Sequence, residues 1–190
     1  MRLTPLLLST LLIGALGALP RAQIKSFTLE EMVQTSDDAV YGQVVASRVF
    51  RVDHPVDGQD LFFTVLTVEG RGLSDGRSLT VDLLTPGGFL DETNGVFNSE
   101  APAADDMKVG KRVVAFYRWA DDMGGGVAGN ALVAAHGGLY RTVEGPRGTA
   151  VLGRGEGYAV SANVRLGHLE SAVAALRAIQ LRSRTANPVR

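Results

Sequence analysis

Short apolar runs that alternate with polar residues, separated by glycines, fill most of this 190-residue chain. The clearest run covers 79–83, where Leu79, Val81 and Leu83 alternate with Thr80 and Asp82. This period of two is typical of a strand with one buried face. Similar runs predict strands over 39–50, 61–68, 112–119, 132–135 and 139–143, and a last hairpin over 149–152 and 158–160. Short strands joined by hairpin-length turns favour a mainly β fold, a small antiparallel barrel, over a parallel α/β sheet.

A helix is predicted on each side of these strands. Thr28 followed by Glu31 forms a capping box, which begins a short helix that ends near 36–38. An apolar stripe at helical spacing predicts a second helix over 164–181, packed on or beside the barrel. The stripe consists of Leu166, Leu169, Val173 and Leu176. We therefore expect a barrel domain over 26–160, then this helix, then a frayed basic tail over 182–190.

The first residues have the layout of a cleaved secretory signal peptide over 1–22. Arg2 precedes an apolar run over 6–19, and small residues follow it. The run is shorter than the roughly 20 apolar residues that a membrane span needs. Because the chain contains no cysteine, it has no disulfide, no thiolate metal site and no lipidated cysteine at the cleavage site. We expect a secreted or periplasmic protein whose mature chain has no membrane span.

Charge and motifs argue against nucleic acid and against a cofactor. The chain has 19 basic and 20 acidic side chains, so no positive excess exists for a phosphate backbone. The segment 124–129 formally matches the dinucleotide pattern G-x-G-x-x-G, but Asp121 and Asp122 precede it and would repel phosphate. We interpret 121–129 as a flexible hairpin loop.

Three residues are candidates for ligand binding. His136 stands beside Gly137 and Gly138, and glycine lets a ligand approach the backbone closely. Trp119 and Tyr140 are aromatic residues that would suit a binding face like that of oligonucleotide-binding barrels. The alternative interpretation is structural: a hydrogen-bonded histidine at a barrel end, and aromatic residues packed in the core and its rim.

The connection over 86–110 is long and acidic, and long loops are often functional or mobile. Its carboxylates are the candidates for calcium, together with a group of three aspartates around Gly58. Neither group matches the twelve-residue calcium loop, so solubility and turn formation are the alternative, and no metal is predicted. The calcium candidates are Asp91, Glu92, Asp105 and Asp106, and the other group is Asp53, Asp57 and Asp60.

The run TLEEMVQTSDDAVYGQV over 28–44 resembles the opening of bacterial secreted domains of unknown function. In these, a short helix leads through a Ser-Asp pair into a valine-rich strand with an internal glycine. The segments 64–72, 79–88, 109–116 and 137–140 continue the pattern. The same order is similar to the netrin-like domains of tissue inhibitors of metalloproteinases, which are OB-type five-stranded barrels. The resemblance implies an OB-like barrel with a helix at each end; because those inhibitors use an N-terminal cysteine, it implies no inhibitory activity here.

These features predict a non-catalytic binding or interaction module whose partner is a protein or small molecule outside the cytoplasm. One alternative is an extracytoplasmic, hydrolase-like enzyme with a dispersed site near His136 and the loop over 86–110, since a dispersed Ser-His-Asp set leaves no sequence motif. Another is an envelope protein that docks a partner on its last helix. An exposed apolar or aromatic patch on the barrel face would favour the first. Converging polar groups in a pocket, with a perturbed titratable residue, would favour the second, and uncovered Leu169, Val173 and Leu176 the third.

Overall fold

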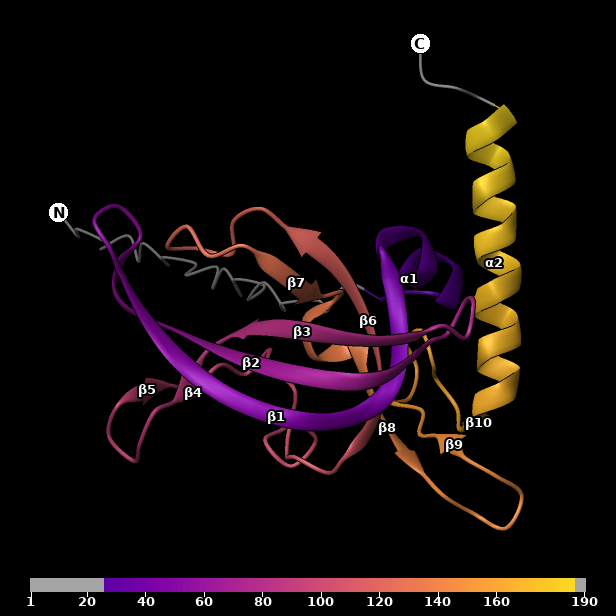
Figure 1. The fold of residues 1–190 in the computed structure, drawn as a ribbon, viewed down its shortest axis with the longest axis horizontal. Helices are drawn as coiled ribbons and strands as arrows, with labels where there is room; N and C mark the ends of the chain where they lie inside the picture. Colours follow the sequence, from indigo (N-terminus) through magenta and orange to yellow (C-terminus); the bar gives the residue numbers. More distant parts are fainter. Residues whose placement is uncertain (1–25, 187–190) are drawn as a thin grey trace, which may run out of the picture.

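A computed structural model describes residues 26–186 of the chain (Figure 1). The predicted signal peptide over 1–22 lies outside the described residues, and so do the last four residues. The elements in order are α1 (Leu29–Thr35), β1 (Asp38–His54), β2 (Gly58–Gly72), β3 (Ser78–Pro86), β4 (Gly88–Phe89), β5 (Gly95–Val96), β6 (Arg112–Ala120), β7 (Gly129–Leu132), the 3-10 helix η1 (Ala135–Gly138), β8 (Leu139–Val143), β9 (Ala150–Val151), β10 (Val164–Arg165) and α2 (Leu166–Ala186).

Five of these strands close into a barrel. Their order is β1-β2-β3-β7-β6, and β6 pairs back onto β1. All neighbours are antiparallel except β3 and β7, which are parallel. This closed arrangement is of the OB type and confirms the predicted small, mainly antiparallel barrel. Beyond the barrel, β8 pairs with residues 113–115 of β6, on the edge opposite β1. β9 pairs with β8, and β10 pairs with β9.

β1 is long and sharply bent, because it pairs with both β2 and β6 (Figure 1). Gly42 lies opposite Gly70 of β2 and opposite Val113 of β6. A Cβ on Gly42 would overlap the carbonyl oxygen of Glu69 and lie 2.8 Å from Val68 Cγ1. Gly42 therefore permits a close approach of two backbones. A β-bulge follows it in β1, between Val44 and Ala46.

Both faces of β6 are buried over 113–117, which explains why the sequence is continuously apolar there. One face points into the barrel, where Val113 and Ala115 pack against Leu66 and Leu83. The other face carries Val114 and Phe116 into a second core, between the barrel and the two helices. Each face therefore belongs to a different cluster of buried residues, as the alternation of a strand requires.

The second core fixes α2 against the barrel. Leu166, Leu169 and Val173 are buried there, and Leu176 packs against the same cluster. The apolar stripe is thus covered by the chain's own barrel, which removes the observation that would favour a partner-docking helix. α2 continues to Ala186, beyond the predicted end of the helix at 181, and the last four residues of the predicted tail lie outside the described residues. Among the described residues, no helix is long and apolar enough to cross a membrane.

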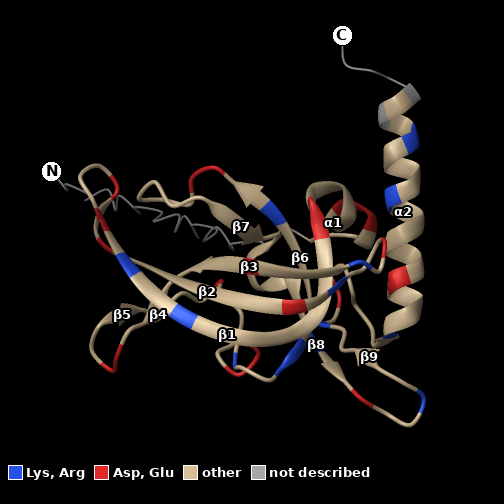
Figure 2. Ribbon diagram, in the orientation of Figure 1, with Lys and Arg blue, Asp and Glu red and all other residues tan. Residues whose placement is uncertain are grey.

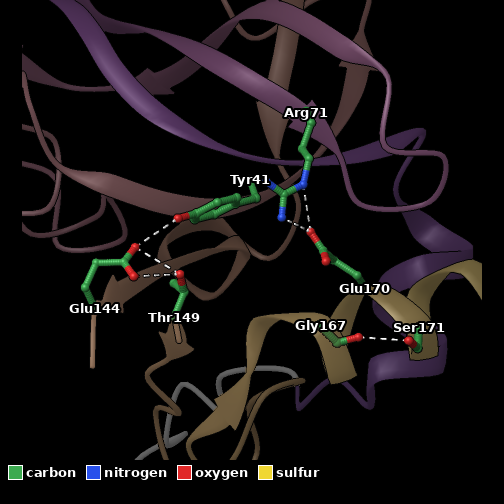
Figure 3. Close-up of polar contacts among 7 residues, drawn as sticks. All are labelled: Tyr41, Arg71, Glu144, Thr149, Gly167, Glu170 and Ser171. Atoms are coloured by element: carbon green, nitrogen blue, oxygen red, sulfur yellow. Dashed lines mark hydrogen bonds and ion pairs between the residues drawn. The ribbon is translucent and has the colours of Figure 1, made fainter. Parts of the chain in front are cut away.

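Polar contacts surround this junction (Figure 3). Arg71 of β2 donates to Glu170 of α2 at 2.7 Å, and its guanidinium lies 5.0 Å from the centre of the Tyr41 ring. The Tyr41 hydroxyl donates to Glu144 at 3.5 Å, and Thr149 donates to the same carboxylate at 2.9 Å. The Arg71–Glu170 pair is partly exposed, so its effect on stability is at most about 1 kcal/mol and α2 is held mainly by its apolar face.

Candidate functional site

A hollow lies where the interior of the barrel opens at one end; we call it the barrel-mouth cavity. Its volume is about 860 Å³. The floor is formed by Ser47 and Val49 of β1 and Thr64 of β2. Ser47 lies opposite the core residue Leu66, and Val49 lies opposite Thr64. Because directly opposite residues share a face, the floor continues the inner face of the barrel.

One wall of this cavity comes from the connection over 86–110, which carries the two-stranded ribbon β4–β5. The ribbon is fixed where it leaves β3. The Thr64 hydroxyl donates to the carbonyl of Gly87 at 2.8 Å, and the Asn98 side-chain amide donates to that of Pro86 at 3.0 Å. A Cβ on Gly88 would overlap the Thr64 hydroxyl and lie 2.9 Å from Val49. Hydrogen bonds and the small glycines thus hold the wall close to the floor.

The wall is apolar and largely open to solvent. Phe97 is the extreme case, with 79% of its surface exposed. Phe89, Val96 and Val109 also line the cavity and are exposed. Single exposed apolar residues are ordinary, but a contiguous group of them beside a hollow marks a binding surface. Exposed apolar side chains therefore gather at the cavity's rim, on the connection over 86–110 and not on the barrel face where a binding patch was expected.

His136 also lines the cavity, on η1. The two residues before it, Ala134 and Ala135, have φ values of 55° and 53°, a left-handed conformation that costs energy without glycine. The His136 backbone N–H donates to the carbonyl of Glu100 at 2.8 Å, which ties η1 to the long connection. Its ring nitrogen Nε2 lies 3.0 Å from the Tyr158 hydroxyl, while Nδ1 is buried and has no hydrogen-bond partner among residues 26–186.

Arg154 also lines the cavity, near His136. Its guanidinium lies 5.9 Å from the ring centres of both Tyr140 and Tyr158. Its Nη2 is 3.6 Å from the buried carboxylate of Asp106. Arg141 Nε approaches the other oxygen of Asp106 at 3.2 Å, but not with the alignment of a hydrogen bond. A single buried carboxylate is therefore shared by two arginines.

The other two predicted ligand-binding residues lie elsewhere. Tyr140 is 0% exposed: it packs edge-on against Phe116, its hydroxyl accepts the N–H of Val160 at 3.3 Å, and burial raises the pKa of its hydroxyl. Trp119 is 55% exposed and lines a separate hollow of about 320 Å³ with Phe50 and Asn130, which we call the Trp119 hollow. The structure thus places His136 in the barrel-mouth cavity, Tyr140 in the core, and Trp119 on another surface.

The candidate calcium residues are spread over separate contacts. Asp91 accepts hydrogen bonds from Asn94 and Thr93, which lower the pKa of its carboxyl to about 2. Asp105 pairs with Lys108 and Lys111, which lower its pKa, and Glu92 is exposed. Asp106 is the buried partner of the two arginines. Among the described residues, no three His, Asp or Glu side chains gather as metal ligands would.

The aspartates around Gly58 likewise stabilise their own hairpin. Arg51 pairs with Asp53 at 2.9 Å and with Asp60 at 2.8 Å. Asp57 accepts the N–H of Gly125 at 2.8 Å, which links the β1–β2 hairpin to the glycine-rich segment between β6 and β7. That segment joins two antiparallel strands and no helix follows it, as expected for a hairpin loop. Acidic and basic residues are interspersed over the molecule, with acidic residues frequent at hairpin tips (Figure 2).

Sequence reasoning missed the cavity's wall and Arg154. The wall carried a signal: the apolar pairs Phe89-Leu90 and Val96-Phe97 stand inside an otherwise polar, acidic connection. Arg154 carried none, because it lies in a glycine-rich stretch with no motif around it. Comparison with protein-family models, curated proteins and solved structures found no significant match.

Proposed function

We propose that this chain is an exported, non-catalytic binding module that holds a small apolar molecule in the barrel-mouth cavity. The observation that carries the proposal is a hollow of about 860 Å³ whose wall and rim are formed by Phe89, Val96, Phe97 and Val109. Pockets for small molecules are typically ~300–1,000 Å³ and apolar, with a few polar groups that orient the ligand. Export is proposed from the charged start and apolar run of residues 1–22.

The alternative, a hydrolytic site at His136, has less support. Within residues 26–186, the His136 ring has one hydrogen-bond partner, the Tyr158 hydroxyl. Two serines, Ser47 and Ser99, line the cavity, but neither hydroxyl is bonded to the histidine. Nucleophilic catalysis requires a base within hydrogen-bond reach of the nucleophile and a group that orients the base. The polar groups at this end of the cavity suit the orientation of a ligand better than its cleavage.

We also propose that the barrel is related to the netrin-like domains that the sequence resembles. This relation is supported by the five-stranded OB-type order and by helices at both ends of the barrel. A shared fold does not transfer an activity, so this resemblance adds nothing to the choice of ligand.

Titration with the neutral apolar dye Nile red tests the proposed function. We expect saturable binding at one dye per chain, with enhanced and blue-shifted emission, because the cavity removes the dye from water. The control is Trp119→Leu, which alters the Trp119 hollow and leaves the barrel-mouth cavity unchanged. Equal binding by the native chain and this variant supports the proposal. Absence of saturable binding, or its loss in Trp119→Leu, would contradict it.

A further inference from the structure

The charged residues that line the barrel-mouth cavity have one sign. Lys108 and Arg154 are basic, His136 is the other titratable side chain, and no acidic residue is among the described residues that line it. Two carboxylates contact these basic groups: Asp105 pairs with Lys108 at 2.9 Å, and the buried Asp106 lies 3.6 Å from Arg154. The surface that a ligand would meet is therefore apolar with a cationic region, although the chain as a whole has a formal charge of -1.

Arg154 is the centre of this cationic region. Its side chain is 22% exposed, whereas that of Arg141 on the same carboxylate is 60% exposed. Two guanidinium groups share one carboxylate, so the cluster of Arg141, Arg154 and Asp106 has a net charge of one positive unit. The excess is costly at Arg154, because the more buried group has less water to solvate it. An anion in the cavity would compensate that charge.

The cationic and apolar parts of the cavity come from different elements. Arg154 follows β9 and His136 lies just before β8, whereas Phe89, Val96 and Phe97 of the apolar wall belong to β4, β5 and the residue after β5. In Figure 1, β4 and β5 lie to the left of the barrel, and β8 and β9 lie to its lower right. A ligand that fills the cavity would meet apolar side chains on one side and Arg154 on the other.

We propose that the cavity's ligand is an amphipathic carboxylate, with its head bound by Arg154 and its apolar body against the ribbon β4–β5; this inference rests on the proposed function. The planar guanidinium can present paired N–H donors to the two oxygens of a carboxylate. The aromatic rings of Tyr140 and Tyr158 hold it in place by cation–π contact. Lys108 lines the same cavity, but Asp105 pairs with it at 2.9 Å, so the charge that would repel a cationic head group is that of Arg154.

Competition against bound Nile red tests this inference with three ligands that share one chain length: decanoate, decanol and decylamine. At neutral pH we expect decanoate to displace the dye at a concentration at least tenfold lower than decanol, and decylamine to be the weakest. Equal displacement by decanoate and decanol, or preference for decylamine, would overturn the assignment of a carboxylate ligand. The proposed function would still be supported in that case, because the dye binds. Failure of the dye to bind would instead refute the proposed function itself.

The variant Arg154→Met assigns the preference to one side chain. Methionine keeps an unbranched apolar side chain, and Asp106 retains Arg141 as its partner. We expect Nile red binding to persist and the tenfold preference for decanoate to disappear. Arg48→Met, which changes an arginine of the Trp119 hollow, is the matched control and should keep the preference. A preference that survives in Arg154→Met, or that is lost in Arg48→Met, would contradict the role of Arg154.

Discussion

Gly42→Ala is expected to lower the free energy of unfolding by about 2–3 kcal/mol, the usual cost of forcing extra atoms into a packed site. β1 is flanked by β2 and β6 at this position, so it cannot move away from either neighbour. A Cβ would overlap the carbonyl oxygen of Glu69 and lie 2.8 Å from Val68 Cγ1. For a chain of this length, the change corresponds to a Tm lower by roughly 5–10 °C, which thermal or urea unfolding would measure.

Gly167→Ala is the matched control for this prediction. Gly167 lies in α2, and a Cβ there would meet open space. Alanine also has the higher helix propensity, so this variant should be as stable as the native chain or slightly more stable. If both variants had the native Tm, the backbones of β1 and β2 would not approach each other at Gly42 as closely as the closed barrel requires.

Ser47→Trp is expected to abolish Nile red binding, or to weaken it by more than tenfold, with little change in stability. Ser47 lies on the floor of the barrel-mouth cavity and is exposed, so an indole at this position would occupy the space of the ligand. Tryptophan is well tolerated in strands, and hence the barrel should fold normally. Fluorescence titration measures the affinity, and urea unfolding checks the fold.

Val45→Trp places the same side chain on the same strand but outside the cavity. Val45 is exposed at the bulge of β1 and is not one of the lining residues. The affinity of the Val45→Trp variant for Nile red should equal that of the native chain. Native affinity in Ser47→Trp, with a native unfolding curve, would show that the dye binds elsewhere.

The barrel could be predicted because its signals are local. Alternation over 79–83 predicts a strand, and β3 covers Ser78–Pro86. The ends of the strands were less predictable. β1 continues to His54 and β2 begins at Gly58, because the pairing between them extends beyond the apolar residues. Pairing between distant segments also decides the last strands. β9 pairs with β8 and β10, not with 158–160, where Val160 is buried in the core.

The site was much less predictable, because residues far apart in the chain form it. Ser47, Thr64, Phe97, His136 and Arg154 meet at one cavity, and no short window of sequence contains two of them. His136 was identified by its neighbouring glycines. Tyr140 belongs to the core because β8 pairs with β6 in a register that places it opposite Val114 of the second core. Hydrophobic pattern alone does not separate such a core aromatic from a surface one like Trp119.

Amide chemical-shift mapping of the isotope-labelled chain during titration with decanoate tests most directly whether a ligand binds in the barrel-mouth cavity. We predict saturable shifts that are largest at Thr64, Asn98, His136 and Arg154, all of which line this cavity. The amides of Trp119 and Asn130, in the Trp119 hollow, should not move. Shifts concentrated at Trp119 and Asn130, or no saturable shifts anywhere, would contradict the account.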